Sequence, residues 1–126
     1  MSGPLVVVGD ALLDRDIEGR ADRLSPEGLA PVLEDLEERT RPGGAALAAA
    51  LAASAGHEVV LVTALSDDSP GVELRRLIET FGVRTAALQL RGATPQKIRV
   101  RSAGRSLVRM DKGCGEAGIG PCTKEA

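Results

Sequence analysis

Hydrophobic and polar positions along the chain predict strands alternating with helices. Residues 5–8 form an unbroken apolar run that ends in Gly9-Asp10, and residues 58–63 and 83–88 have the same character. Such Val-rich runs are typical of parallel strands buried on both faces. Residues 44–55 and 69–81 between them have helical character. The order strand, helix, strand, helix, strand predicts an α/β fold with a Rossmann-like parallel sheet.

The ends of the two predicted helices carry capping signals. The first is alanine-rich, begins near Gly43 or Gly44 and is ended by Gly56 at the C′ position. The second begins at Ser69-Pro70, which we expect to be its N-cap and first helical residue. Asp67-Asp68 lies just before it, where acidic side chains favour the helix dipole, so a capping role is expected there as well.

The remaining segments predict a small β-sheet beside this body. Residues 13–19 and 31–36 are short, charged, extended candidates. In residues 96–102, Ile98 and Val100 alternate with Lys97, Arg99 and Arg101, and residues 107–110 repeat the alternation after a turn at Gly104. This pattern predicts a hairpin with one basic face. Residues 113–126 are rich in glycine and show no periodicity, so we expect an irregular tail.

Composition narrows the class of protein and its partners. The 126 residues are 43% hydrophobic and 27% charged, which is typical of a globular domain. Phe81 is the one aromatic residue and the net charge is −2, which argues against a nucleic-acid partner. No apolar run approaches the ~20 residues of a membrane span, and the first residues do not resemble a signal peptide. We therefore expect no membrane partner and, by default, a cytoplasmic location.

The cysteines and the histidine do not indicate a metal site. Cys114 and Cys122 both lie in the last stretch, and His57 is distant from them in the sequence. This spacing matches no zinc pattern. We expect two free thiols and a surface histidine.

Asp14 and the pair Gly43-Gly44 are the candidate binding residues. A carboxylate accepts hydroxyl protons, and a helix that opens on glycines offers N–H groups with no Cβ atom in the way. Together they predict a site for a polyhydroxylated ligand. The alternatives are that Asp14 is satisfied by local backbone, that the glycines serve backbone geometry alone, and that Asp10 is structural rather than a ligand.

Several segments match a known pattern in order and spacing. They are Val6-Val7-Val8-Gly9-Asp10 with Leu13-Asp14, Leu24-Ser25-Pro26-Glu27, Pro31-Val32, Arg41-Pro42-Gly43-Gly44-Ala45-Ala46, and Thr94-Pro95 with Lys97-Ile98-Arg99-Val100 and Val108-Arg109-Met110-Asp111. In these segments the chain resembles the start of the ribokinase/PfkB carbohydrate-kinase family, most of all the D-glycero-β-D-manno-heptose-7-phosphate kinases. The resemblance covers nearly all of the chain but only the N-terminal part of a family member.

The resemblance implies a partial ribokinase-like fold, with residues 1–112 as body and lid and with lid segments 13–36 and 96–111. Family members transfer the γ-phosphoryl group of Mg·ATP to a sugar hydroxyl, and the lid often makes a dimer contact. By resemblance, Asp14 would bind sugar hydroxyls, and Gly43 and Gly44 would let the sugar approach. Lys97, Arg99 and Arg109 would face an anionic group such as a heptose 7-phosphate, in charge-assisted contacts.

Two departures from the family pattern shape the expected function. Leu47 stands where the family carries an asparagine aimed at the sugar, so we expect weakened sugar affinity. No Gly-Ala-Gly-Asp-like segment follows, so no catalytic residue is identified, and ATP and Mg²⁺ are implied without a binding region for them. We expect a truncated sugar kinase, inactive alone. The alternatives are a non-catalytic module that dimerises or pairs with a kinase chain, and a tail that arises from a disrupted reading frame.

Overall fold

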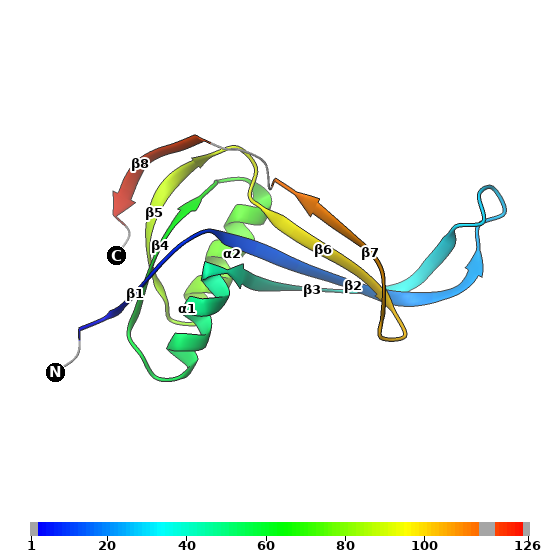
Figure 1. Cartoon of the computed structure of the whole chain (residues 1–126), viewed down its shortest axis with the longest axis horizontal. Helices are drawn as coiled ribbons and strands as arrows, with labels where there is room; N and C mark the ends of the chain where they lie inside the picture. The colour runs from blue at the N-terminus through cyan, green and yellow to red at the C-terminus, as the bar shows by residue number, and fades with distance from the viewer. Residues whose placement is uncertain (1–2, 114–117, 125–126) are drawn as a thin grey trace.

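The described part of the chain folds into two four-stranded β-sheets with no strand in common (Figure 1). The computed structural model describes residues 3–113 and the backbone of residues 118–124. One sheet, with both helices, forms the body, and the second sheet extends away from it as a lid (Figure 1). The predicted α/β body with a small β-sheet lid is confirmed.

The body sheet has the strand order β1-β4-β5-β8. Its strands are β1 (Leu5–Val8), β4 (Val59–Leu65), β5 (Arg84–Arg91) and β8 (Gly118–Lys124). The first three are parallel, as the apolar runs predict, and β8 is antiparallel to β5. The irregular tail is therefore a wrong prediction for residues 118–124, because strand pairing there uses backbone groups and needs no apolar alternation. Cys114 lies outside the described residues.

The helices α1 (Ala45–Ser54) and α2 (Ser69–Thr80) pack into one core with the body sheet. Ala46 and Ala49 of α1 and Leu74 and Ile78 of α2 are buried in the same cluster as Leu61. The small alanine side chains let α1 approach the strands closely. Neither helix in the described part of the chain is long and apolar enough to cross a membrane.

The N-cap of α2 is Asp68 rather than Ser69. Its carboxylate accepts a hydrogen bond from the Gly71 N–H at 2.9 Å, so Ser69 is already in the helix and Pro70 follows it. The prediction for Ser69 is wrong by one residue, and the expected capping role of the Asp67-Asp68 pair is confirmed for Asp68. A carboxylate at this position also meets the favourable end of the helix dipole.

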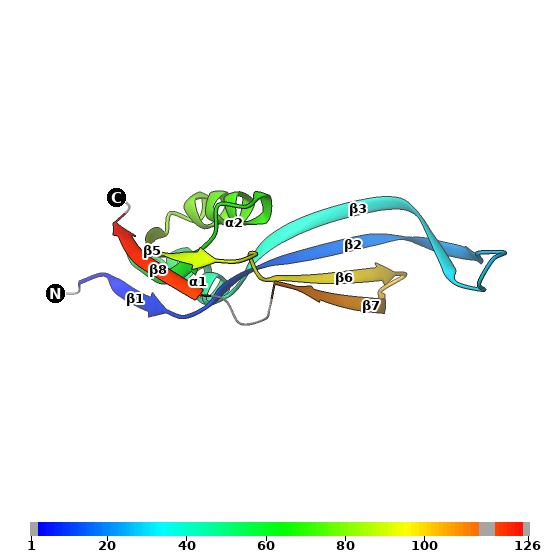
Figure 2. The ribbon, with the colours of Figure 1, turned by 90° about the horizontal axis from the view of Figure 1, so that it is seen from above.

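The first strand is not buried on both faces. β1 lies at the edge of the sheet, and Val8 is 74% exposed. The core lies on the face of β4 that carries Val59, Leu61 and Thr63, which is the face that α1 covers. Figure 2 shows the body edge-on with its helices and the lid reaching away. An apolar run predicts a strand, but it does not distinguish an edge strand from a central one.

The lid sheet has the order β3-β2-β6-β7. Its strands are β2 (Ala11–Leu24), β3 (Pro31–Gly44), β6 (Gln96–Ser102) and β7 (Arg105–Lys112). β2 is antiparallel to β3 and parallel to β6, and β6 and β7 form the predicted hairpin. The strands predicted at 13–19 and 31–36 are real but much longer, since β2 and β3 are charged along most of their length and pair mainly with each other.

Candidate functional site

Asp14 and Gly43 lie against each other at the start of the lid. Gly43 is the register partner of Leu12, so Gly43 and Asp14 face the same side of the β2–β3 ladder. A Cβ atom on Gly43 would lie 2.5 Å from Asp14 Oδ2, which is closer than real side chains allow. The two predicted elements therefore converge. Asp14 itself lies within the lid strand β2 rather than at the end of a buried body strand.

Gly44 has a different role from Gly43. Its backbone has φ 59° and ψ −132°, which is open essentially to glycine alone, and a Cβ there would lie 2.5 Å from the Asp10 carbonyl oxygen. That carbonyl accepts a hydrogen bond from Ala45 N at 2.9 Å. Gly44 thus joins the end of β3 to the start of α1 by backbone geometry. Leu47 is exposed in the first turn of α1, beside this joint.

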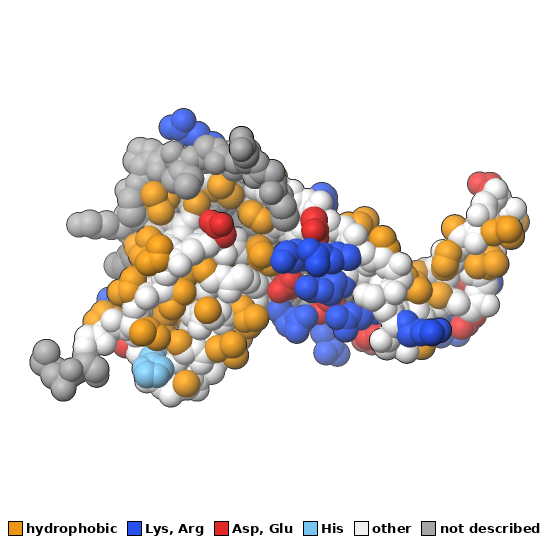
Figure 3. All heavy atoms as spheres, viewed as in Figure 1, with side chains coloured by type: hydrophobic (Ala, Val, Ile, Leu, Met, Phe, Trp, Pro, Cys, Tyr) orange, Lys and Arg blue, Asp and Glu red, His pale blue; other side chains and the backbone are white. Residues whose placement is uncertain are grey.

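Charged side chains share the face of the lid that carries Asp14. We call this set the charged lid face, and its members alternate with residues that point to the other side. The carboxylates are Asp14, Asp16, Glu18, Glu37 and Asp111, and the cations are Arg39, Arg41, Lys97, Arg99, Arg101 and Arg109. Figure 3 shows basic side chains gathered over this part of the lid. The predicted basic face of the hairpin formed by β6 and β7 is confirmed, and β2 adds acidic groups to it.

The ion pairs on this face are crossed with respect to the strand register. Asp14 is the register partner of Arg41 on β3, yet its Oδ1 accepts a hydrogen bond from Arg99 Nη1 at 3.1 Å. Asp16 is the register partner of Arg99 on β6, yet its Oδ2 accepts one from Arg41 Nη2 at 2.6 Å. Each arginine therefore reaches the diagonal carboxylate, which lies within the range of a long side chain.

Each aspartate keeps one oxygen outside these pairs. Asp14 Oδ2 rests over Gly43 and accepts no hydrogen bond from the residues that the structure describes, and the Asp14 side chain is 15% exposed. Asp16 Oδ1 is fully buried and has no hydrogen-bond partner in the described part of the chain. Asp14 can therefore offer an acceptor to a ligand, whereas the remaining acceptor of Asp16 is closed off.

The three predicted cations are all on this face, but they are not equally available. Arg109 donates two hydrogen bonds to Asp111, each of 2.9 Å, and this contact, with smaller contributions from Lys97 and Arg99, lowers the pKa of the Asp111 carboxyl. Arg99 is bound to Asp14. Lys97 forms no ion pair among residues 3–113, which leaves its ammonium group the most available of the three.

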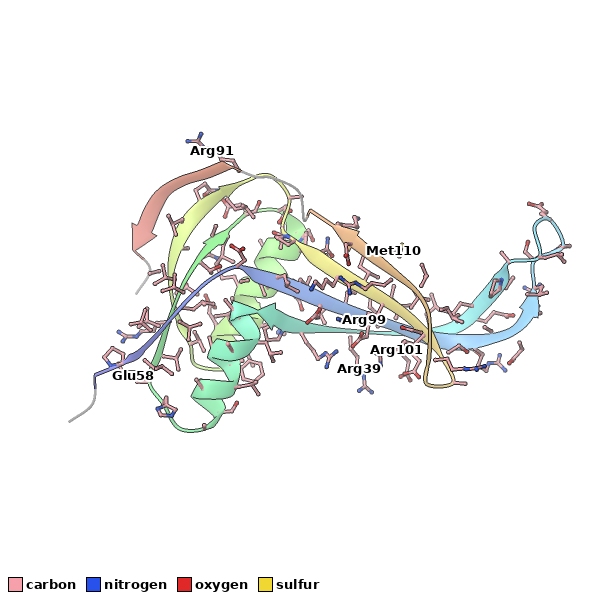
Figure 4. All side chains as sticks on the ribbon, in the orientation of Figure 1. Arg39, Glu58, Arg91, Arg99, Arg101 and Met110 are labelled. Carbon is pink, nitrogen blue, oxygen red and sulfur yellow. The ribbon has the colours of Figure 1, made fainter. Side chains whose placement is uncertain are left out.

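Sequence reasoning missed Asp16, Arg39 and Arg41 as members of this face. The signal was present, because Asp14, Asp16 and Glu18 alternate along β2, and Arg39 and Arg41 alternate just before Pro42. Figure 4 shows Arg39, Arg99 and Arg101 together on the lid. Asp10 is exposed, and the contact established for it is through its backbone. Chemically, this face offers a free carboxylate oxygen beside cations, which suits a ligand carrying both hydroxyls and a negative charge.

Comparison with known proteins places this geometry in context. No family model matches the chain. It is 51% identical over 112 residues to the bifunctional protein HldE of Streptomyces coelicolor, and 39% identical over 107 residues to HldE of Hydrogenovibrio crunogenus. These matches cover 89% and 85% of this chain and 24% and 22% of the relatives. The chain thus spans about a quarter of the length of the relatives that it matches.

Solved sugar kinases have the same fold over most of this chain. A carbohydrate kinase from Agrobacterium tumefaciens aligns with a TM-score of 0.72 and 19% identity, over 88% of this chain and 36% of its own. A ribokinase from Cryptococcus neoformans, solved in complex with ADP, aligns with a TM-score of 0.58 and 21% identity, over 86% and 34%. At these identities the likeness shows the fold alone. Sequence and fold agree: the chain is similar to the N-terminal part of HldE, and it has a partial ribokinase-like fold, like that of the solved ribokinase/PfkB-like carbohydrate kinases.

Proposed function

We propose that this chain is the acceptor-binding part of an ATP-dependent sugar kinase, and that its ligand is a sugar phosphate such as heptose 7-phosphate. The observation that carries the proposal is the Asp14 carboxylate, held by Arg99 on one oxygen and left open over Gly43 on the other. The open oxygen accepts sugar hydroxyls, and the missing Cβ of Gly43 leaves the room that the Asp14 carboxylate and the Leu12 side chain occupy. Lys97 and Arg99 neutralise the phosphate.

These residues would bind the sugar acceptor, and they would not bind ATP or catalyse the transfer. Phosphoryl transfer requires positioning and charge stabilisation around the γ-phosphate, normally with Mg²⁺. The 126 residues contain no segment resembling the family's Gly-Ala-Gly-Asp motif. We therefore assign the ATP-binding and base functions to residues outside these 126, and expect the chain alone to bind the sugar without turning it over. Leu47 can neither donate nor accept a hydrogen bond, so the site has one polar contact fewer than an asparagine would give.

Replacing Asp14 tests the sugar site. We expect Asp14→Asn to lower the affinity for heptose 7-phosphate by about 10- to 100-fold, because hydrogen bonds to charged groups contribute about 1.5–3 kcal/mol. Isothermal titration calorimetry with the purified chain measures this directly, and the unphosphorylated heptose reports the contribution of the phosphate. Glu58→Gln is the matched control, since Glu58 also pairs with an arginine, at 2.8 Å, but lies on the body. Equal binding by Asp14→Asn and the parent chain would refute the site.

A second candidate function is self-pairing through the lid. The lid face opposite the charged one carries Ile17, Val100, Val108 and Met110, and the last two are exposed on β7. Apolar side chains on neighbouring strands of one sheet face form a surface that a second copy can cover. This observation favours a dimer through the lid, with or without sugar binding.

Val108→Glu tests the lid dimer. We expect the parent chain to sediment as a dimer and the variant as a monomer, because a charge buried in an apolar interface loses its hydration. Sedimentation velocity over a range of concentrations gives the result. Leu51→Glu serves as the control, since Leu51 is an exposed leucine on α1, away from the lid. A parent chain that remains monomeric at every concentration contradicts this candidate.

A further inference from the structure

The crossed ion pairs on the charged lid face give Asp14 and Asp16 different roles. In the strand register, Arg41 lies directly opposite Asp14, at the separation where side chains interact most readily. It nevertheless donates to Asp16 Oδ2, at 2.6 Å, on the diagonal. A guanidinium carries several N–H donors in a fixed fork, which match a carboxylate well. An Arg41 side chain released from Asp16 can therefore donate to the Asp14 carboxylate, which lies directly opposite it.

The oxygen that a released Arg41 would reach is the one proposed for the sugar. Asp14 Oδ1 is already occupied by Arg99, at 3.1 Å. Asp14 Oδ2 is therefore the acceptor left to a further donor, and it lies over Gly43, which belongs to the same strand as Arg41. An arginine on this oxygen would compete with a sugar hydroxyl for the same lone pairs.

Asp16 is built to hold Arg41 rather than to bind a ligand. Its Oδ2 is committed to Arg41, and its Oδ1 is fully buried without a hydrogen-bond partner among the described residues. A buried oxygen cannot meet a sugar hydroxyl without rearrangement. We infer that Asp16 is a positioning residue, which keeps Arg41 away from Asp14 Oδ2 and so preserves the acceptor for the sugar. This inference rests on the proposed function, since it assumes that Asp14 receives the sugar.

Positioning of Arg41 by Asp16 and the loss of a negative charge predict opposite effects of Asp16→Asn on the affinity for a sugar phosphate. Asp16→Asn removes one negative charge from the charged lid face, and charge alone would then tighten binding of an anionic sugar phosphate. If Asp16 positions Arg41, the same substitution releases Arg41 to Asp14, and the affinity for heptose 7-phosphate falls by about tenfold. The unphosphorylated heptose, which lacks the phosphate charge, should lose affinity by a similar factor.

A double variant distinguishes a positioning role of Asp16 from a general structural role of Asp16. Asp16→Asn combined with Arg41→Gln has the net charge of the parent chain and contains no arginine that could occupy Asp14. We expect the double variant to bind heptose 7-phosphate within about twofold of the parent, because Arg99 still holds Asp14 Oδ1. Both substitutions are on partly exposed side chains, so each should change the free energy of unfolding by less than the binding effect, as urea titration would show.

The experiment is calorimetric titration of heptose 7-phosphate and heptose into the parent chain, Asp16→Asn, the double variant, Asp14→Asn and Glu58→Gln. The arginine Nε–H signals in an NMR spectrum report independently whether Arg41 moves in Asp16→Asn. Weaker binding by Asp16→Asn with rescue in the double variant supports the inference. Unchanged or tighter binding by Asp16→Asn, or a double variant as weak as the single, overturns it. If Asp14→Asn also binds like the parent, the proposed sugar site itself fails.

Discussion

Gly44→Ala is expected to lower the free energy of unfolding by about 2–6 kcal/mol. The backbone of Gly44 has φ 59° and ψ −132°, and holding a residue other than glycine there costs about 1–3 kcal/mol. A Cβ atom would also lie 2.5 Å from the Asp10 carbonyl oxygen, which is backbone and cannot rotate away. Relieving such an overlap costs about 1–3 kcal/mol more. Because domains of this kind are stable by only about 5–15 kcal/mol, this loss is a large share of the total free energy of unfolding.

Urea-induced unfolding of the purified variant measures this loss. The matched control is Gly82→Ala, because Gly82 also has a positive φ, of 77°, but no heavy atom lies within 4 Å of its would-be Cβ. Gly82→Ala should lower the free energy of unfolding by about 1–2 kcal/mol, which is the cost of holding alanine in a left-handed backbone conformation. The difference between the two variants reports the contact with Asp10 together with the extra backbone cost of ψ −132° at Gly44, both at the joint between β3 and α1. Equal losses would show that the contact relaxes freely and that the joint is not rigid.

Much of the fold follows from local patterns, and the errors share a physical cause. The alternation of Lys97 and Arg99 with Ile98 predicted the lid hairpin and its basic face, because the side-chain period of a strand is fixed. The same logic could not place Val8, since an apolar run is equally compatible with a central and an edge strand. Residues 118–124 pair with β5 through backbone groups, which leave no mark on the side-chain pattern.

The sequence predicted some members of the charged lid face, but not the pairing of their charges. Asp14 and Gly43 lie close together, as the sequence predicted for the carboxylate and the glycines at the helix start, and they do so because β2 and β3 are neighbours. The partner of each charge could not be read from the sequence. Arg41 and Arg99 each had a register partner and a diagonal partner within reach, and the choice between them depends on side-chain packing in three dimensions.

The second large effect is expected at Asp68, which links the body to the lid. Its carboxylate accepts hydrogen bonds from Gly71 N and Thr94 N, each of 2.9 Å, and from the Thr94 hydroxyl. Thr94 is 1% exposed and lies in the connection between β5 and β6, where the chain passes from body to lid. Asp68→Ala removes a helix cap, worth about 0.5–2 kcal/mol, and leaves the Thr94 N–H unpaired, at about 1–3 kcal/mol. We expect a total loss of about 1.5–5 kcal/mol in urea unfolding.

The neighbouring carboxylate supplies the control for this substitution. Asp67 is exposed and precedes the cap, so Asp67→Ala should change the free energy of unfolding by less than about 0.5 kcal/mol. Hydrogen exchange should also show faster exchange at residues 94–98 in Asp68→Ala, because the link between α2 and the lid is lost. A cost confined to α2, with unchanged exchange in β6, would mean that Asp68 acts only as a cap.

The pH dependence of stability gives an independent check on Asp68. Desolvation raises the pKa of its carboxyl, but the hydrogen bonds from Thr94 and Gly71 together outweigh it, and the net pKa is lowered. A carboxyl with a lowered pKa in the folded state stabilises the fold above its unfolded pKa, near 3.9, and this contribution disappears as pH falls through the folded value. The stability gap between the parent chain and Asp68→Asn should therefore be constant from about pH 7 to pH 5 and shrink below about pH 4. A gap that persists unchanged at pH 3 would show that the Asp68 contacts do not depend on its charge.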